Sequence, residues 1–262
     1  MVMVLQPSTA LKSPCMHQDF LPPGIVVLTG AGISKESGID TFRDKDGLWN
    51  RVNLEEVATI EAWHRDKKKV LDFHNDTRRS LRATHILPNA AHNALARLEQ
   101  KYDGEVTVVT QNIDPLHEMA GSRRVLHMHG RDGEIRCMNC GKVFESDEDL
   151  TPASVCPNCK AVGDLRPNIV WFGEMPQHMD EINEVLDRCG LFLAIGTSGE
   201  VYPAAGFVLH VRRHRPRAHT VELNLEPSGN QPLFKEHIYG PATQIVPPYV
   251  ERVLAQGVAL QG

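Results

Sequence analysis

The sequence predicts an α/β protein built on a doubly wound, Rossmann-like parallel sheet, with a smaller helical and zinc-ribbon domain inserted into it. Two observations lead to this prediction. Short apolar runs alternate along the chain with longer segments of helical periodicity, which is typical of parallel strands covered by helices on both faces. A pair of C-x-x-C motifs then interrupts this alternation between residues 136 and 165.

The first predicted strand is the apolar run 25–28, which follows two prolines and a glycine and stops at a glycine-rich turn. A helical region is expected over residues 54–81, and a second helix with an apolar face over residues 90–100. The other elements continue the alternation, with strands at 106–109, 169–172, 191–195 and 220–223 and an amphipathic helix at 179–188 that ends in Cys189.

Composition excludes several classes of protein. The chain has 262 residues, of which 41% are hydrophobic and 23% charged, and this suits one compact globular unit. The net charge is -5 and the basic residues are scattered, so binding to nucleic acid is not expected. No apolar stretch approaches the roughly 18 residues of a membrane span. Residues 1–20 lack the pattern of a signal peptide, and we therefore expect a cytoplasmic protein with an N-terminal tail.

Four of the six cysteines have the spacing of a zinc ribbon. They occur as Cys137-x-x-Cys140 and Cys156-x-x-Cys159, and each pair can supply two thiolates to a tetrahedral zinc ion. Four cysteine ligands leave no coordination position for water, so the metal is expected to be structural. Disulfides would need an oxidising compartment, which nothing in the sequence implies. Cys15 and Cys189 are outside the pattern.

The turn after the first strand, Gly30-Ala31-Gly32, can present backbone N–H groups to a phosphate at the carboxyl edge of the sheet. The dehydrogenase fingerprint G-x-G-x-x-G would need a third glycine where the chain has Lys35. The turn alone therefore fits either a nucleotide site or an ordinary tight turn.

The longer stretch 30–49, GAGISKESGIDTFRDKDGLW, resembles the NAD-binding signature of the sirtuins, which are NAD-dependent protein-lysine deacylases. The resemblance extends over roughly residues 24–250. It implies that Arg43 stabilises the reacting complex and that NAD contacts this stretch through Gly30, Ala31, Gly32, Ser34, Glu36, Thr41, Phe42, Arg43 and Trp49.

The polar segment that follows the second strand, 110–114, should lie at the same edge of the sheet. By resemblance, Gln111 positions the ribose hydroxyls, Asn112 contacts the ribose, and Asp114 orients the nicotinamide carboxamide, with Ile113 in the same NAD-binding segment. From the residues alone, Asp114 before a proline is also a good helix N-cap.

Two histidines alternate with apolar residues at 125–130, as in a half-buried strand, and should point to one face. Pattern alone does not separate a catalytic histidine from a core histidine. The resemblance selects His129, which precedes Gly130, as the general base, because an imidazole with a pKa near ~6.5 can accept a proton from a ribose hydroxyl. His127 is then expected to be structural.

Further NAD contacts implied by the resemblance follow two later strands and precede the C-terminal helix: Gly196, Thr197, Ser198, Asn224, Leu225, Glu226 and Ala242. Residues 168–174 read as a core strand by composition. By resemblance they pair with the backbone of a substrate peptide, a mode that gives little sequence preference, and the contacting residues are Val170, Trp171, Phe172, Gly173 and Glu174.

The acyl pocket departs from one group of relatives. Sirtuins that remove acidic acyl groups such as succinyl carry Tyr-x-x-Arg at a position where this chain has His74 and Thr77. We therefore expect acetyl and other uncharged acyl groups to be preferred. Arg78, four residues after His74, could reach the same helix face, and a protonated His74 could add charge.

The resemblance implies a deacylase that consumes NAD, transfers the acyl group of a protein lysine to ADP-ribose and releases nicotinamide. Its cofactors would be NAD and zinc, and its partners acylated proteins or peptides that bind between two domains. The expected large domain is 21–53, 84–130 and 166–262, and the small domain is 54–83 and 131–165. The alternatives are protein ADP-ribosylation, an NAD-linked oxidoreductase, and a non-catalytic zinc-ribbon module.

Overall fold

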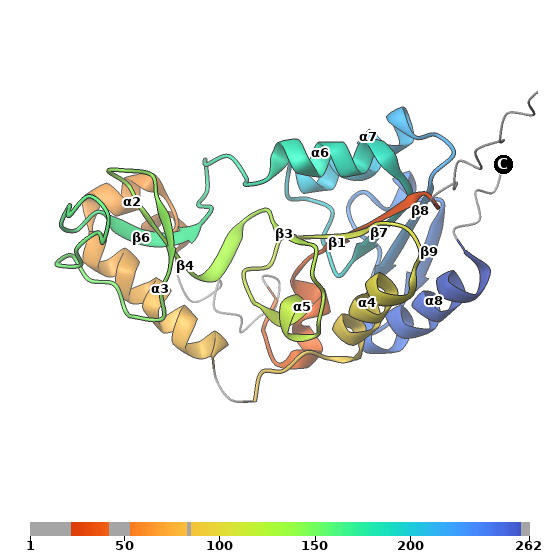
Figure 1. The fold of residues 1–262 in the computed structure, drawn as a ribbon, viewed down its shortest axis with the longest axis horizontal. Helices are drawn as coiled ribbons and strands as arrows, with labels where there is room; N and C mark the ends of the chain where they lie inside the picture. Colours follow the sequence, from red (N-terminus) through yellow and green to blue (C-terminus); the bar gives the residue numbers. More distant parts are fainter. Residues whose placement is uncertain (1–21, 42–52, 83–84, 258–262) are drawn as a thin grey trace, which may run out of the picture.

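The structure is a computed structural model that describes residues 22–41, 53–82 and 85–257. Its larger part is a six-stranded parallel sheet with helices on both faces, and its smaller part is a three-stranded antiparallel sheet packed with two helices (Figure 1). The predicted α/β class and the inserted smaller unit are both confirmed. Within the described residues, no helix is both long and apolar enough to cross a membrane.

The parallel sheet has the strand order β3-β2-β1-β7-β8-β9. After β1 the chain adds β2 and β3 on one side, and it returns later to add β7, β8 and β9 on the other. The switch point of the sheet, where doubly wound folds bind ligands, therefore lies between β1 and β7. The strand bounds are β1 Gly24–Thr29, β2 Val106–Thr110, β3 Val125–His127, β7 Cys189–Ile195, β8 His219–Asn224 and β9 Glu236–Tyr239.

Helices cover both faces of this sheet (Figure 1). Ile25 and Val27 of β1 belong to the core cluster of α4, Ala90–Lys101, and α8, Ala242–Gln256. Val26 and Leu28 belong to the cluster of α6, Met179–Arg188, and α7, Phe207–His214. Because both faces are buried, the strand reads in the sequence as a continuous apolar run.

The smaller part contains β4 Gly130–Cys137, β5 Val143–Glu145 and β6 Leu165–Ile169 in the order β5-β4-β6. Helices α2, Ile60–Arg65, and α3, Lys67–Leu81, pack against it, with Trp63, Leu71 and Trp171 in the shared core.

The predicted helical region 54–81 is not continuous. It is divided into a 3-10 turn, Leu54–Glu56, followed by α2 and α3. Each α-helix begins at its own side-chain cap, since Thr59 accepts a hydrogen bond from the Ala62 N–H and Asp66 accepts one from the Lys69 N–H.

Two other predicted boundaries are wrong. The strand expected at 169–172 ends at Ile169, because its partner strand β4 begins at Gly130, opposite Ile169, and the Phe172 N–H binds the Ala58 carbonyl instead. Trp171 is 2% exposed and Phe172 is 63% exposed. Cys189 begins β7 instead of ending α6. Its thiol is buried, and burial raises its pKa to about 12, which fits an unreactive core cysteine.

The turns after β1 and β7 cross in direct backbone contact. Gly30 donates its N–H to the Ile195 carbonyl at 3.0 Å, and Gly32 donates to the Gly196 carbonyl at 2.9 Å. A Cβ atom on Gly32 would lie 2.7 Å from the Gly196 Cα atom, and Gly196 itself has a φ of +61°. The glycines of the predicted phosphate turn are therefore required by this crossing, whether or not a phosphate is bound.

The four cysteines of the predicted zinc ribbon come together as expected. One ligand atom from each of Cys137, Cys140, Cys156 and Cys159 lies within 4.8 Å of all the others. Asn139 donates a hydrogen bond to the Cys159 sulfur at 3.5 Å and, with the Ala161 N–H, lowers the pKa of that thiol to about 6. Four converging sulfur atoms at this spacing fit a structural zinc ion.

We expect Gly32→Ala to destabilise the protein by about 1–3 kcal/mol, the usual cost of forcing atoms into a packed site. The measurement is urea unfolding without NAD. Gly24→Ala is the matched control, because a Cβ atom there meets its nearest neighbour at an ordinary 3.7 Å. Equal unfolding free energies for the two variants would contradict the importance of the crossing.

Cys156→Ser should release zinc and unfold the smaller part of the molecule, because a structural zinc site contributes its binding energy directly to folding. Zinc content by mass spectrometry and a thermal melt measure both effects. Cys189→Ser changes a buried cysteine outside the cluster and should keep its zinc. An unchanged zinc content in Cys156→Ser would argue against the four-cysteine site.

Candidate active site

A buried polar network occupies the carboxyl edge of the sheet beside the glycine turn. Ser34 donates a hydrogen bond to Asp114 Oδ2 at 3.0 Å and accepts one from Asn112 Nδ2 at 3.2 Å. Asn112 Nδ2 also lies 3.2 Å from the Gly30 carbonyl. The predicted residues of two strand ends are thus joined directly, and their side chains are oriented before any ligand binds.

Asp114 also performs the capping role expected from the sequence. Its Oδ1 atom accepts a hydrogen bond from the Leu116 N–H at 3.1 Å, at the start of α5, Leu116–Met119. The helix begins one residue later than the pattern predicted, with Pro115 before its first turn. Burial raises the pKa of Asp114, because it opposes the charged form of the carboxyl group.

Two histidines behind this network were not singled out by the sequence. The Thr29 hydroxyl donates to Thr110 at 2.9 Å, so at 3.0 Å it accepts a hydrogen bond from His117 Nε2. His92 Nδ1 accepts from the Asn89 N–H in a capping box. Burial lowers the pKa of His92 to about 4 and that of His117 well below its usual value. Both rings are therefore neutral. For these two histidines the sequence contains one signal, the spacing of Asn89 and His92, which is that of a capping box.

The two predicted strand histidines reach neighbouring carbonyl groups of the same loop. His129 Nδ1 lies 3.0 Å from the Gln111 carbonyl, and His127 Nδ1 lies 2.9 Å from the Asn112 carbonyl. They differ at the other ring nitrogen, since His127 Nε2 is bound to Glu118 at 2.7 Å. β3 ends at His127, so His129 lies just beyond the strand.

The protonation of His129 follows from its neighbour. A carbonyl oxygen can only accept, so Nδ1 carries the proton and Nε2 has the lone pair. Burial lowers the pKa of His129, and the hydrogen bond to Gln111 opposes this shift only in part. The ring is therefore neutral at neutral pH, as a general base must be.

The ends of β2, β7 and β8 are tied together by side chains. Gln111 Nε2 donates to the Thr197 hydroxyl at 3.0 Å, and Asn224 Nδ2 donates to the Thr197 carbonyl at 2.9 Å. Leu225, next to Asn224, is 66% exposed. The predicted NAD-binding segments of Gln111, Thr197 and Asn224 are therefore linked to one another along the carboxyl edge of the sheet.

Glu36 has a structural partner that the sequence did not predict. Its carboxylate accepts hydrogen bonds from the N–H and the hydroxyl of Thr243, at 2.9 and 2.6 Å, in the first turn of α8. Negative charge at a helix N-terminus is favourable. This contact holds the turn after β1 beside Ala242. Phe42, Arg43 and Trp49, which the sequence assigned to NAD binding, lie outside the described residues.

The predicted peptide-binding segment is fixed from behind by Arg166, whose side chain is fully buried. This guanidinium binds both Glu174 oxygens at 2.9 Å and stacks on Trp171, 3.2 Å from the ring centroid. Burial raises the pKa of Glu174, but the bonds from Arg166 outweigh it and the net shift is downward. Trp171 and Glu174 thus anchor the segment, while Phe172 is exposed.

Trp171 also contacts the predicted acyl-pocket residue His74. The indole Nε1 atom donates to His74 Nε2 at 3.0 Å, and the two rings are stacked. Burial, and then the charge of Arg166, lower the pKa of His74 to about 4, so the ring carries no charge at neutral pH. The Thr77 hydroxyl donates to the Phe73 carbonyl at 3.0 Å.

The sequence left open whether Arg78 brings a positive charge to the helix face of His74. Its side chain is buried and bound to other groups. It donates hydrogen bonds to the Glu148 carbonyl at 2.7 Å and to Asn75 Oδ1 at 2.8 Å.

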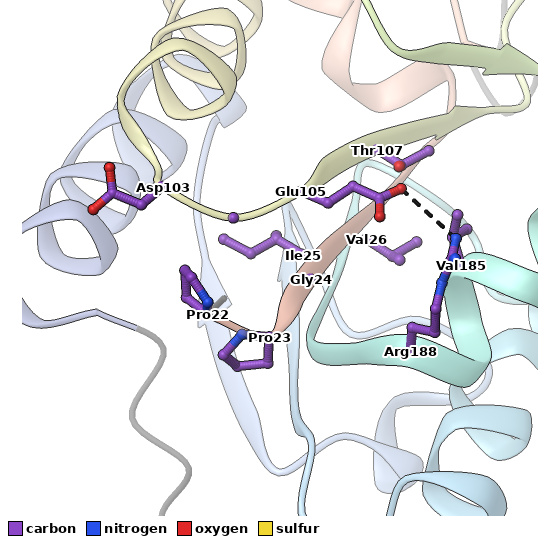
Figure 2. Close-up of a pocket in the computed structure, with 11 residues that line it drawn as sticks. Pro22, Pro23, Gly24, Ile25, Val26, Asp103, Glu105, Thr107, Val185 and Arg188 are labelled. Atoms are coloured by element: carbon purple, nitrogen blue, oxygen red, sulfur yellow. Dashed lines mark ion pairs between the residues drawn. The ribbon is translucent and has the colours of Figure 1, made fainter. Parts of the chain in front are cut away.

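A pocket of about 280 Å³ lies at the opposite edge of the sheet (Figure 2). It is lined by the amino ends of β1 and β2, including Ile25, Glu105 and Thr107, together with Arg188 of α6. Doubly wound sheets bind ligands at the carboxyl ends of their strands. This pocket is therefore separate from the polar network.

The Sir2 family model matches residues 30–203 of the chain. The NAD-dependent protein deacylase SIR2rp3 of Trypanosoma brucei is 54% identical over 232 residues, which cover 88% of this chain and 94% of that protein. The NAD-dependent protein deacylase of Escherichia coli K12 is 53% identical over 234 residues, covering 88% of this chain and 82% of the relative.

The fold agrees with this relationship. A crystal structure of a Sir2 homolog–NAD complex superposes with a TM-score of 0.77 at 36% identity, covering 90% of this chain and 91% of that chain. The family match extends across the glycine turn, the polar network, both histidines and the four cysteines. From its sequence and its fold together, this protein belongs to the Sir2 family.

Proposed function

We propose that this NAD-dependent protein deacylase transfers the acyl group from a protein lysine to ADP-ribose, with His129 as the general base, and that it prefers uncharged acyl groups. The observation that carries the first part is the geometry of His129. Its Nδ1–H is held by the Gln111 carbonyl, and its Nε2 lone pair is left available at the edge where the NAD-binding segments meet.

The co-substrate NAD supplies the reacting ribose carbon. The bond from this carbon to nicotinamide breaks as the acyl oxygen of the lysine bonds to the same carbon. The chain supplies orientation and proton transfer. Ser34 and Asn112 hold Asp114, which is proposed to face the carboxamide of the leaving nicotinamide. Gln111 and Thr197 are proposed to position the ribose. His129 Nε2 is then proposed to take a proton from a ribose hydroxyl, so that this oxygen attacks the acyl carbon. The bond from the acyl carbon to the lysine nitrogen breaks, the amine leaves with a proton, and one water molecule adds at the acyl carbon, so that the acyl ester stays on the ribose.

The backbone of 170–174 supports a proposed site for the substrate peptide. Val170 N–H is bound to the His129 carbonyl and Phe172 N–H to the Ala58 carbonyl, which fixes the segment to both parts of the molecule. Phe172 and Gly173 are exposed, and an extended peptide is proposed to pair with the backbone of 170–174 along this outer side. Such backbone pairing predicts little preference for peptide sequence.

The acyl preference rests on the charges near His74. The ring is neutral, Thr77 carries no charge, and Arg78 is committed to the Glu148 carbonyl and Asn75. None of these three residues offers a cation to an acyl carboxylate. The alternatives of a reoriented Arg78 or a charged His74 both require breaking buried contacts, so succinyl should be a poor substrate relative to acetyl.

Protein ADP-ribosylation is the alternative within the family. The reaction products distinguish deacylation from ADP-ribosylation and from an NAD-linked oxidoreductase, because deacylation alone releases nicotinamide, free lysine and acyl-ADP-ribose in equal amounts.

A location in the cytoplasm stays a prediction.

His129→Ala should lower kcat for an acetylated peptide by about 10²–10⁴-fold, the usual contribution of a positioned base, while NAD affinity changes little. In the parent, the acid limb of the pH profile should lie below the ordinary imidazole pKa of ~6.5, because burial lowers the pKa of His129. His64→Ala, at an exposed position of α2, is the control. A rate within a few-fold of the parent would remove His129 from the mechanism.

Introducing His74→Tyr and Thr77→Arg together should raise kcat/KM for succinyl-lysine by about tenfold or more, since a hydrogen bond to a charged group is worth roughly 1.5–3 kcal/mol. The acetyl value should change much less. Thr77→Arg alone is tested in parallel, because a tyrosine removes the acceptor of Trp171 Nε1. Thr77→Gln separates charge from size. Strong desuccinylation by the parent that survives Arg78→Ala would refute the proposed preference.

A further inference from the structure

Two histidines and an aspartate meet on the outer surface of the large sheet's helical layer. Asp187 belongs to α6, and His210 and His214 belong to α7, the two helices that cover the same face of the sheet (Figure 1). One possible ligand atom from each residue lies within 4.8 Å of the other two. None of the three residues takes part in the proposed reaction or in the four-cysteine cluster.

The spacing of the two histidines suits a metal ion. They are four residues apart and therefore lie one helical turn apart on the same face of α7, the arrangement by which helices commonly present two imidazoles to zinc. Their ring centroids are 4.3 Å apart. His210 Nε2 is 2.7 Å from Asp187 Oδ1, so the third ligand is already beside the pair.

The hydrogen bond of His214 gives a second, independent indication. His214 Nδ1 lies 3.0 Å from the His210 carbonyl, and a carbonyl can only accept, so Nδ1 carries the proton. The Nε2 lone pair is then available for coordination. Metal-bound histidines characteristically donate their other ring N–H to a carbonyl or carboxylate, which fixes the tautomer and the ring orientation.

We propose that Asp187, His210 and His214 bind a divalent transition-metal ion of the zinc type. Two imidazoles and one carboxylate are borderline ligands that suit zinc, whereas magnesium prefers oxygen alone. Three protein ligands leave a fourth tetrahedral position to water. The ion would take the place of the proton now shared between His210 and Asp187.

The site should be weaker than the four-cysteine site for physical reasons. Asp187 and His214 are exposed, and exposed side chains lose conformational freedom when they coordinate an ion. Ligand bonds of about 2.0–2.2 Å also require the three groups to draw together from their present separation. Each imidazole must also present an unprotonated nitrogen to the ion, so protons compete with the metal for these ligands. Bound metal would link α6 to α7.

The test is zinc binding to the protein with its cysteine site already filled, measured by calorimetry and by metal content after dialysis. We expect the parent to bind one further zinc ion per chain, to melt at a higher temperature in its presence, and to show no such response to magnesium. His210→Gln, His214→Gln and Asp187→Asn should each lower the affinity by at least about tenfold, since even changes to outer-shell partners cost that much.

His219→Gln is the matched control. His219 forms the same kind of hydrogen bond to a carboxylate, 2.8 Å from Glu236, but the cluster that could hold a metal does not include it. Melting curves without added zinc verify that every variant is folded. The proposal is overturned if the parent takes up no second zinc ion. It is equally overturned if the second ion persists when His210 and His214 are both replaced, or if it is lost in His219→Gln.

Discussion

Gly32 and Gly196 approach each other so closely that neither position has room for a side chain. The contact joins the turns after β1 and β7, the two strands on either side of the switch point of the sheet. Because the turns are locked together, Ser34 is held where it can bind Asn112 and Asp114 from the end of β2. Thr197, one residue after the crossing, is likewise held beside Gln111. The proposed NAD site is organised by a packing constraint of the backbone.

Burial lowers the pKa of four histidines, His74, His92, His117 and His129, and the uncharged rings have different roles. His92 and His117 support the polar network from behind without adding charge. His129 becomes a free base, because its remaining proton is held by a carbonyl group. His74 becomes an uncharged acceptor for Trp171, which in turn lies on the guanidinium of Arg166. This last set of contacts connects the proposed peptide-binding segment to the proposed acyl pocket.

Much of the fold could be predicted because its signals are local. The continuous apolar run at 25–28 indicates a strand that is buried on both faces. The spacing of the two C-x-x-C motifs by itself indicates a metal site. The boundary errors have the opposite cause. Whether β6 continues past Ile169 depends on where Trp171 finds its core, and that core comes from α2 and α3, about a hundred residues earlier in the chain.

The sequence by itself determined the α/β class, the four-cysteine cluster, the family and the candidate residues at the ends of the strands. Each of these is recorded by residue type and spacing. Only the tertiary structure decided which nitrogen of His129 is available, that Arg78 is committed elsewhere, that Glu36 caps α8, and that Asp187 meets two histidines of α7. These are properties of hydrogen-bond partners and burial. They depend on segments that are distant in the chain and meet only when it folds.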